Sequence, residues 1–295
     1  MKHKRNGMAH IIYYILMSRG ITETIGEAAE KLPSLFTEWR APAFFVQCGS
    51  GFEPERLFDS EPQSIEMRSL PGMLEHKTPD QEHPLLLYGM VNDIPVLATK
   101  GHRHLYEGCG TLPCILPLCV AHRLGVNAMV FMDGALSLNN DIKPGTWMLL
   151  TDFINAHSCS PLDGNHELLP DAFPDMTNAL SQHLNSELVN ALSSVGITPR
   201  LGVYMSRPGS QFCTVSEANT ARANGADLVG HDLVMEIIMG HALGCHVSAF
   251  ALATLMAPDY YSRRLTREAM LDACHYCSID MMRGLRNGIR EFVIA

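Results

Sequence analysis

The sequence has little positive charge, and this shortage excludes one class of partner. Its 295 residues include 22 lysines and arginines against 31 aspartates and glutamates, which gives a formal net charge of −9 at pH 7. Proteins that bind nucleic acid usually present a basic face, so we expect no nucleic acid as a partner. The acidic balance does not exclude a small anion as ligand, because a single pocket can be positive on an acidic protein.

Long hydrophobic runs are also missing. The apolar stretch at residues 11–17 follows three basic residues, as in a signal peptide, but it lacks a small-x-small cleavage site and is too short to span a bilayer. Nine cysteines lie in apolar context without a regular framework, which is typical of reduced thiols. We therefore expect a cytoplasmic protein that contacts no membrane, with residues 1–20 as a partly disordered N-terminal extension.

Several motifs that mark other protein classes are absent as well. We find no Walker loop, dinucleotide-binding glycine fingerprint or G-x-S-x-G elbow in a suitable context. Cys274 and Cys277 form a C-x-x-C pair, but no second pair at zinc-site spacing accompanies them, so we interpret them as helical core cysteines. We expect no metal site, and we interpret His231, His241 and His246 as structural residues rather than metal ligands.

What the chain does contain is an alternation of predicted strands and helices. The expected strands cover residues 43–47, 84–88, 94–99, 128–132, 146–150, 201–204 and 247–252. The expected helices cover residues 21–39, 112–124, 215–224 and 264–292, the last with Gly284 as a candidate break. No Pro/Gly/Ser-rich linker divides the chain, so residues 21–295 are predicted to form one α/β domain with ligand sites at strand ends.

A polar loop follows the predicted strand at residues 94–99. The run Gly101-His102-Arg103-His104-Leu105-Tyr106-Glu107-Gly108 places four ionisable groups and a tyrosine between two glycines. Loops at strand ends hold most of the chemistry of α/β proteins, so this density of polar groups indicates a ligand site.

The run resembles the Gly-Arg-x-His-x-Tyr-Glu-Gly motif of the trimeric purine nucleoside phosphorylases, a family that includes the methylthioadenosine phosphorylases. Further family landmarks follow in the family's order across residues 43–292, among them Gly49-Ser50-Gly51, Phe173-Pro174-Asp175-Met176 and Gly225-Ala226-Asp227-Leu228-Val229-Gly230. The resemblance implies a nucleoside phosphorylase-like α/β fold, with a mixed central sheet flanked by helices. It also implies a homotrimer in which a neighbouring subunit offers an aromatic residue, at a position that falls near Leu168 or Leu169 here.

The resemblance implies a phosphate site with one substituted cation. Ser50, His104 and the backbone near Gly134 match family positions that hold phosphate. The family's arginine falls on His102, which carries less charge at neutral pH and has no bidentate fork. Arg103 is adjacent, but neighbours on an extended segment point to opposite faces, so only a local shift would let it replace the lost arginine.

Two carboxylates also fall in the region that the resemblance assigns to phosphate. The family's phosphate-binding serine or threonine falls on Asp232. A carboxylate about 4 Å from a phosphate oxygen would cost roughly 4 kcal/mol at an effective dielectric near 20, or about a thousandfold in affinity. Either Asp232 turns away or is protonated, or phosphate is not the physiological ligand. Asp133 replaces an asparagine, where it either adds charge to the pocket or caps a neighbouring turn.

On the sugar side, the resemblance places Tyr106 against the ribose and puts His231 where the family has a methionine. Glu107 is expected to orient His104, and we assign these two as the candidate catalytic residues. The alternative without a catalytic role is that this polar loop carries a pair of solvated charges on the protein surface.

On the base side, the resemblance points to Phe212, Cys213, Thr254 and Leu255. Cys213 and Leu255 replace the glutamate and asparagine with which the family contacts the purine, and leucine cannot donate to a departing base. Thr254 or Asp259 is the candidate replacement donor. Loss of one such contact typically costs a hundredfold or more in rate.

The resemblance therefore implies a pentosyltransferase that cleaves a nucleoside N-glycosidic bond with phosphate as co-substrate and no cofactor, with altered or weakened activity. Two other functions stay open: an inactive paralogue that binds a nucleoside or other small ligand, and a hydrolase in which Asp232 or Asp133 activates water.

Overall fold

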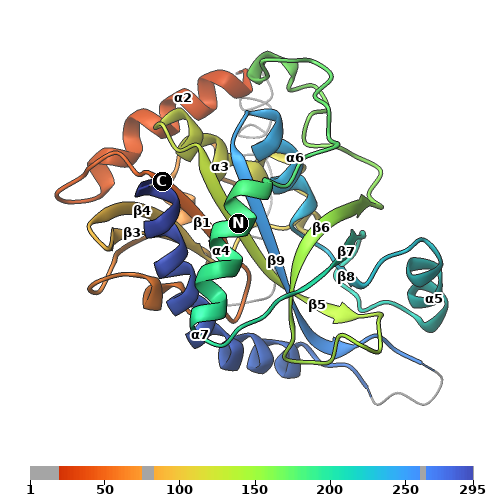
Figure 1. Ribbon diagram of the computed structural model, residues 1–295. Coiled ribbons are helices and arrows are strands. Elements are labelled where there is room, and N and C mark those ends of the chain that lie inside the picture. The colour runs from red at the N-terminus through yellow and green to blue at the C-terminus, as the bar shows by residue number, and fades with distance from the viewer. Residues whose placement is uncertain (1–19, 75–82, 260–263, 295) are drawn as a thin grey trace, which may run out of the picture.

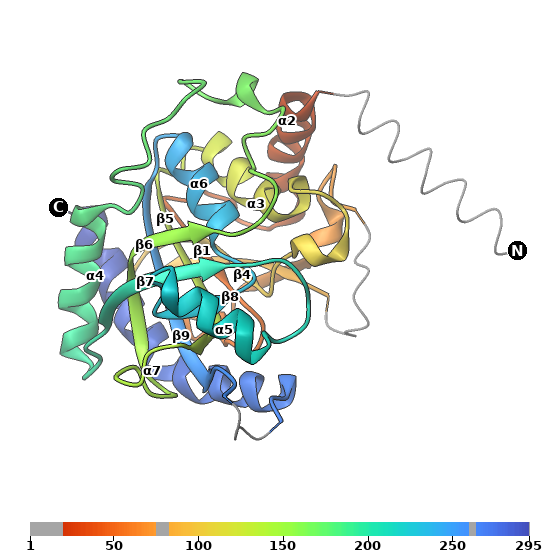
Figure 2. The same cartoon turned by 90° about the vertical axis from the view of Figure 1, so that its right-hand side faces the viewer.

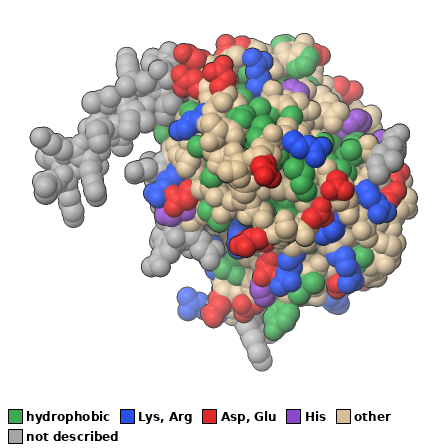
Figure 3. Space-filling view, turned by 90° about the vertical axis from the view of Figure 1, so that its left-hand side faces the viewer, with side chains coloured by type: hydrophobic (Ala, Val, Ile, Leu, Met, Phe, Trp, Pro, Cys, Tyr) green, Lys and Arg blue, Asp and Glu red, His purple; other side chains and the backbone are tan. Residues whose placement is uncertain are grey.

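The computed structural model describes residues 20–74, 83–259 and 264–294 (Figure 1). The predicted N-terminal extension, apart from Gly20, lies outside these residues. None of the helices within these three ranges combines the length and the apolar character that a membrane crossing requires. On the face shown in Figure 3, acidic and basic side chains are interspersed rather than gathered into a field of one sign.

Nine strands of the described residues form one mixed sheet. The mixed sheet confirms what the resemblance implied, whereas only seven of the strands were expected from the sequence. The order of the nine strands across the sheet is β2-β3-β4-β1-β5-β8-β7-β6-β9, and β9 also pairs with β5. The β5–β8–β7–β6–β9 part therefore closes on itself into a ring. The strands are β1 Phe44–Cys48, β2 Gln63–Glu66, β3 Leu85–Val91, β4 Ile94–Lys100, β5 Ala128–Ser137, β6 Trp147–Asn155, β7 Arg200–Ser206, β8 Leu228–Gly230 and β9 His246–Met256.

Helices cover both faces of the sheet (Figures 1 and 2). α2 (Ile21–Lys31), α3 (Leu112–Arg123) and α6 (Val234–Ala242) pack into one hydrophobic cluster, whereas α4 (Gln182–Ser194) and α7 (Arg267–Ile294) pack into a second. A sixth helix, α5 (Val215–Ala223), contributes to a smaller third cluster beside β8.

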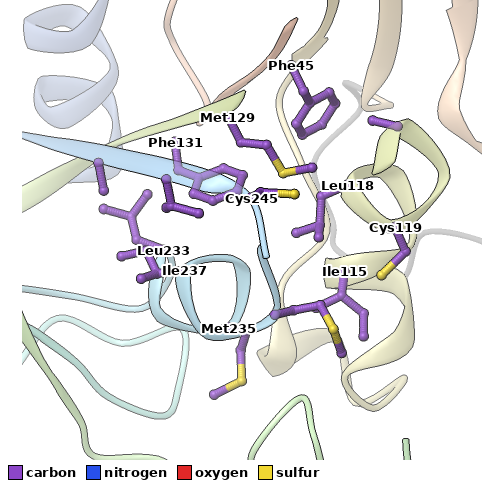
Figure 4. Close-up of a cluster of buried hydrophobic side chains, with 14 of the residues drawn as sticks. Phe45, Ile115, Leu118, Cys119, Met129, Phe131, Leu233, Met235, Ile237 and Cys245 are labelled. Atoms are coloured by element: carbon purple, nitrogen blue, oxygen red, sulfur yellow. The ribbon is translucent and has the colours of Figure 1, made fainter. Parts of the chain in front are cut away.

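The side chains in the first half of β5 alternate between the two main clusters, which explains why residues 128–132 are all apolar. Met129 and Phe131 face the first cluster, where Figure 4 shows them near Ile115 of α3 and Ile237 of α6. Val130 and Met132 belong to the second cluster. A strand that is buried on both faces has a continuous apolar sequence, and this pattern predicted the strand at residues 128–132.

The predicted hairpin is confirmed. β3 and β4 pair antiparallel from Leu85↔Lys100 to Val91↔Ile94. Asn92 and Asp93 at the turn have positive φ values of 50° and 65°. Two consecutive positive φ values define the type I′ turn that two-residue hairpins favour, and Asn and Asp tolerate them well.

Other element boundaries differ from the prediction. The first helix ends at Lys31, because Pro33 follows and the chain continues as a 3₁₀ turn rather than an α-helix. The last helix begins at Arg267 and continues past Gly284 without a break. β5 also extends through Asp133-Gly134-Ala135, where a turn was expected, because pairing with β9 holds this segment extended.

Gly284 permits close contact between α7 and α4, which leads to a prediction. A Cβ at this position would lie 2.6 Å from Leu192 Cδ2 and 3.2 Å from Leu192 Cα. We expect Gly284→Ala to lower the free energy of unfolding by about 1–3 kcal/mol, despite the higher helix propensity of alanine. Urea denaturation measures this change.

Gly26→Ala in α2 is the control, because a Cβ there would meet nothing within 4 Å. It should stabilise the protein by roughly 0.5–1 kcal/mol. If both variants were stabilised, the close packing of α7 on α4 would not limit stability.

Candidate functional site

The candidate site lies where several strand ends converge. The carboxyl ends of β1, β4 and β8 lead into the segments that hold Ser50, His104 and Asp232, and all three approach the middle of β5. They border a cavity of about 330 Å³, a volume in the range of small-molecule sites. Its lining includes Ser50, His104, Tyr106, Glu107, Asp133, Gly134, Phe212, Cys213, His231 and Asp232.

Within the polar loop, Glu107 holds Arg103 rather than a ligand. Arg103 donates to Glu107 Oε2 from Nε at 2.8 Å and from Nη2 at 2.6 Å, and it also donates to the carbonyl of Leu74. The two charged side chains are only 2% and 1% exposed. The local shift that would let Arg103 replace the lost arginine is therefore not observed.

Glu107 also fixes the backbone of the loop, whereas another carboxylate binds the His104 ring. The backbone N–H of His104 donates to Glu107 Oε1 at 2.8 Å, which closes a short 3₁₀ turn at Leu105–Glu107. The ring atom Nδ1 of His104 lies 2.7 Å from Asp232 Oδ1. The expectation that Glu107 orients the imidazole is thus corrected, since Asp232 is its ring partner.

Asp232 neither turns away from the site nor becomes neutral. Burial raises the pKa of this carboxyl group, but the attraction of His104 and His102 outweighs burial and holds the pKa below its usual range. An ionised carboxylate therefore lies beside His104, at the position that the resemblance assigned to a phosphate-binding hydroxyl.

His102 belongs to a buried polar network beneath this pair. Its ring is 2% exposed, with Nε2 at 4.0 Å from Asp232 Oδ2 and Nδ1 at 3.5 Å from Glu236 Oε1. Gln47 Nε2 donates to the same Glu236 oxygen at 2.9 Å. Burial lowers the pKa of His102, but the attraction of Asp232 and Glu236 outweighs burial and raises the pKa to about 10.

Gln47 and Glu236 are site residues that the sequence analysis missed. A signal for Glu236 was present, because it is the single carboxylate in the otherwise apolar run Val234-Met235-Glu236-Ile237-Ile238. A buried carboxylate needs a partner, which a sequence alone does not locate.

The carboxyl group of Asp133 accepts the backbone N–H of Gly134, the donor that was expected to hold phosphate. The N–H of Gly134 donates to Asp133 Oδ1 at 2.8 Å. Burial, reinforced by the charge of Asp232, raises the pKa of Asp133, so Asp133 holds a proton more firmly than Asp232 does. Gly49 makes room for it, since a Cβ there would lie 2.0 Å from Asp133 Oδ1. Asp133 lies within strand β5 and borders the cavity, so the alternative in which it caps a neighbouring turn is not observed.

Aromatic and imidazole rings line the sugar side of the cavity. Tyr106 stacks on His104 with ring centroids 4.5 Å apart and an interplanar angle of 11°. His231 meets Tyr106 edge-on at 6.1 Å, and its Nδ1 bonds to the carbonyl of Arg207 at 3.0 Å. Both residues predicted to face ribose therefore border the same space.

On the base side, only half of the predicted set borders the cavity. Phe212 and Cys213 line it, whereas Thr254 and Leu255 do not. Thr254 is 2% exposed and donates its hydroxyl to the carbonyl of Ala135 at 2.8 Å. Leu255 packs in the apolar cluster beside β8. Asp259 is exposed at the end of β9.

Two arginines that were not selected from the sequence, Arg207 and Arg267, border the cavity. Arg207, directly after β7, forms an ion pair with Glu217. Arg267, the first residue of α7, also borders a second cavity of about 690 Å³ that includes Ser50, His102 and His104. Guanidinium groups are suited to phosphate recognition, so Arg267 is a candidate cation.

Cys274, His241 and His246 lie in structural surroundings outside the lining of the cavity. Cys274 is fully buried in α7. His241 Nε2 bonds to the carbonyl of Asp175 at 2.9 Å, and His246 Nδ1 lies 3.1 Å from Ser181 Oγ.

Comparison with known proteins agrees with the resemblance. The phosphorylase superfamily model matches residues 48–273. The chain is 32% identical to purine nucleoside phosphorylase of Rattus norvegicus over 219 residues, which cover 72% of this chain and 75% of the rat protein. It is 31% identical to that of Bos taurus over 266 residues, 87% and 91% of the two chains.

In fold, the chain resembles Schistosoma mansoni purine nucleoside phosphorylase in complex with inosine. The TM-score is 0.82 at 22% identity, and the match covers 93% of this chain and 98% of that one. The family model and the mammalian relatives together establish that this chain belongs to the phosphorylase superfamily and, within it, to the purine nucleoside phosphorylase family.

Proposed function

We propose that this chain binds a purine nucleoside in the 330 Å³ cavity and cleaves its N-glycosidic bond with phosphate, at a rate lowered by the Asp232 carboxylate. The observation that supports this proposal is the convergence of Ser50, His104, Tyr106 and Phe212 on one cavity. Solved structures of the similar schistosome enzyme contain hypoxanthine, inosine and adenosine.

In the proposed reaction, a phosphate oxygen attacks the anomeric carbon of the ribose as the C–N bond breaks. The bonding electron pair leaves on the base nitrogen, and the base then takes a proton from solvent. Ser50, His104 and Arg267 lie where they can hold phosphate, while Tyr106 and His231 border the sugar. Cys213 is the cavity residue at a base-reading position, and its thiol is a weak donor to the departing base.

A second candidate function is hydrolysis of the same bond. The specific observation in its favour is the carboxylate–imidazole pair of Asp232 and His104, whose atoms lie 2.7 Å apart beside the cavity. Such a pair can take a proton from water, which would then attack the anomeric carbon in place of phosphate.

Free-base release from inosine, guanosine, adenosine and methylthioadenosine, with and without phosphate, tests these functions. We expect slow release that requires phosphate, and loss of release in His104→Gln. Release without phosphate would instead establish hydrolysis. The control is His241→Ala, which removes an imidazole outside the cavity. No release by the folded wild-type protein would leave nucleoside binding as the function.

We also propose that the chain acts as a cytoplasmic homotrimer. In its support, Phe173 is 88% exposed and follows Leu168 and Leu169 in the segment where the resemblance placed an aromatic residue of the neighbouring subunit. Light scattering should give three times the chain mass of 32.6 kDa. A monomer would exclude this assembly.

A further inference from the structure

Three side chains at the floor of the site have the composition and spacing of a metal centre. His102 and His104 come from the loop after β4, and Asp232 comes from the segment after β8. One ligand atom from each residue lies within 4.8 Å of the other two. Two imidazoles and one carboxylate are a common ligand set for divalent transition metals.

The second observation is a buried imidazole whose ring nitrogens make no hydrogen bond to any described residue. His102 is 2% exposed, yet neither of its ring nitrogens makes a hydrogen bond within the described part of the chain. Buried polar groups are almost always hydrogen-bonded, so an unsatisfied one indicates a missing partner. A metal ion between His102 and Asp232 would satisfy the nitrogen that faces the carboxylate.

The surroundings of His102 also match those of a metal ligand. Its Nδ1 faces Glu236 Oε1 at 3.5 Å, and Gln47 in turn donates to that oxygen at 2.9 Å. A metal-bound histidine usually directs its other ring nitrogen to a carboxylate or carbonyl, which fixes the ring orientation. Glu236 takes this place here, and Nε2 is left to face Asp232.

We propose that His102 Nε2, His104 Nδ1 and the Asp232 carboxylate bind one divalent first-row transition-metal ion. The ion replaces the proton that His102 carries without metal, and this proton is released to solvent. With bonds of about 2.1 Å, tetrahedral ligand atoms lie about 3.4 Å apart. The His104–Asp232 and His102–Asp232 distances of 2.7 Å and 4.0 Å each differ from this value by less than an ångström. Small side-chain rotations therefore complete the site.

The ion would be accessible and would change the electrostatics of the cavity. His104 and Asp232 border the 330 Å³ cavity, and His102 and His104 border the 690 Å³ cavity. An ion held by three protein ligands keeps a coordination position for water or an anion. Its charge would offset Asp232, the group that most opposes phosphate.

Titration of the metal-free protein with Co²⁺, followed by visible absorption and calorimetry, tests the proposal without any substrate. We expect one Co²⁺ per chain, with ligand-field bands and no thiolate-to-cobalt charge-transfer band. The absence of that band separates this site from the nine cysteines. Asp232→Asn should abolish binding, and Glu236→Gln should weaken it by roughly 10–100-fold.

His241→Ala is the control, because it removes an imidazole outside the cluster and should bind Co²⁺ as the wild type does. Circular dichroism establishes that each variant is folded. If Asp232→Asn does not fold, the wild-type stoichiometry and Glu236→Gln decide the matter. Three results would each overturn the proposal: no stoichiometric binding of Co²⁺, a thiolate-to-cobalt charge-transfer band, or equal affinity for Co²⁺ in the wild type and Glu236→Gln. In that case the three side chains would form an ion-pair network around a protonated His102.

Discussion

Asp232→Ser is expected to raise the affinity for phosphate by about a thousandfold. The change removes an ionised carboxylate that lies 2.7 Å from His104 and restores a hydroxyl donor. At a separation of about 4 Å and an effective dielectric near 20, the repulsion removed is about 4 kcal/mol. This corresponds to about three decades in the dissociation constant. The KM for phosphate in nucleoside cleavage measures the change.

The variant also alters the balance of charge around His102. In the wild type, Asp232 and Glu236 lie on either side of the His102 ring at 4.0 Å and 3.5 Å. Once the carboxylate at position 232 is gone, the imidazolium is neutralised only from the side of Glu236. Because Asp232 exerts the largest attraction on the protonated His102 ring, its loss lowers the pKa of His102, so the expected gain is assigned to the lost repulsion alone.

Two further variants isolate the cause of this gain. Asp232→Asn removes the charge without adding a hydroxyl, so it should give most of the improvement. Asp175→Ser removes an exposed carboxylate whose partner is the neighbouring Thr177, and the KM for phosphate should not change. Chelator-treated protein keeps any bound metal out of the comparison. An unchanged KM in both Asp232 variants would contradict the assigned repulsion.

Much of the fold could be predicted from the sequence, because the central strands each contain a long apolar run. β1, β5 and β9 are buried on both faces, so their runs of Val, Phe, Met and Ala identify them directly. The sequence analysis missed α6, because Val234–Ala242 is apolar on nearly every side and periodicity does not separate such a helix from a strand. It missed β8 because three residues are too few to show a pattern.

The location of the site was predictable, but the partners within it were not. The polar loop after β4 and the Gly49-Ser50 turn after β1 can be recognised in the sequence as candidate site segments, because each directly follows a predicted strand. That Asp232 pairs with His104, and Glu107 with Arg103, depends on side-chain directions set by packing. Thr254 and Leu255 were assigned by resemblance, which carries over an alignment position but not the direction of a side chain. Here Thr254 bonds to the carbonyl of Ala135 and Leu255 packs in the cluster beside β8.

Glu107→Gln is expected to lower the free energy of unfolding by about 3–5 kcal/mol. The substitution keeps the shape of the side chain but removes the negative charge that neutralises Arg103. Because both side chains are no more than 2% exposed, the guanidinium would stay buried without its counter-ion. The same carboxylate accepts the backbone N–H of His104, so the loop that holds the imidazole loses a charge-assisted bond as well. Urea denaturation measures the loss.

The Asp280→Asn variant provides the comparison, because its ion pair with Arg283 lies on the surface with side chains 58% and 59% exposed. An exposed pair contributes about 0–1 kcal/mol, so this variant should unfold almost as the wild type does. The double change Arg103→Met with Glu107→Gln removes both charges and should recover part of the stability, since breaking a buried pair costs more than replacing it. If Glu107→Gln lost no more stability than Asp280→Asn, then Arg103 would not depend on Glu107 for its burial. Arg103 would in that case regain its place as a candidate phosphate ligand.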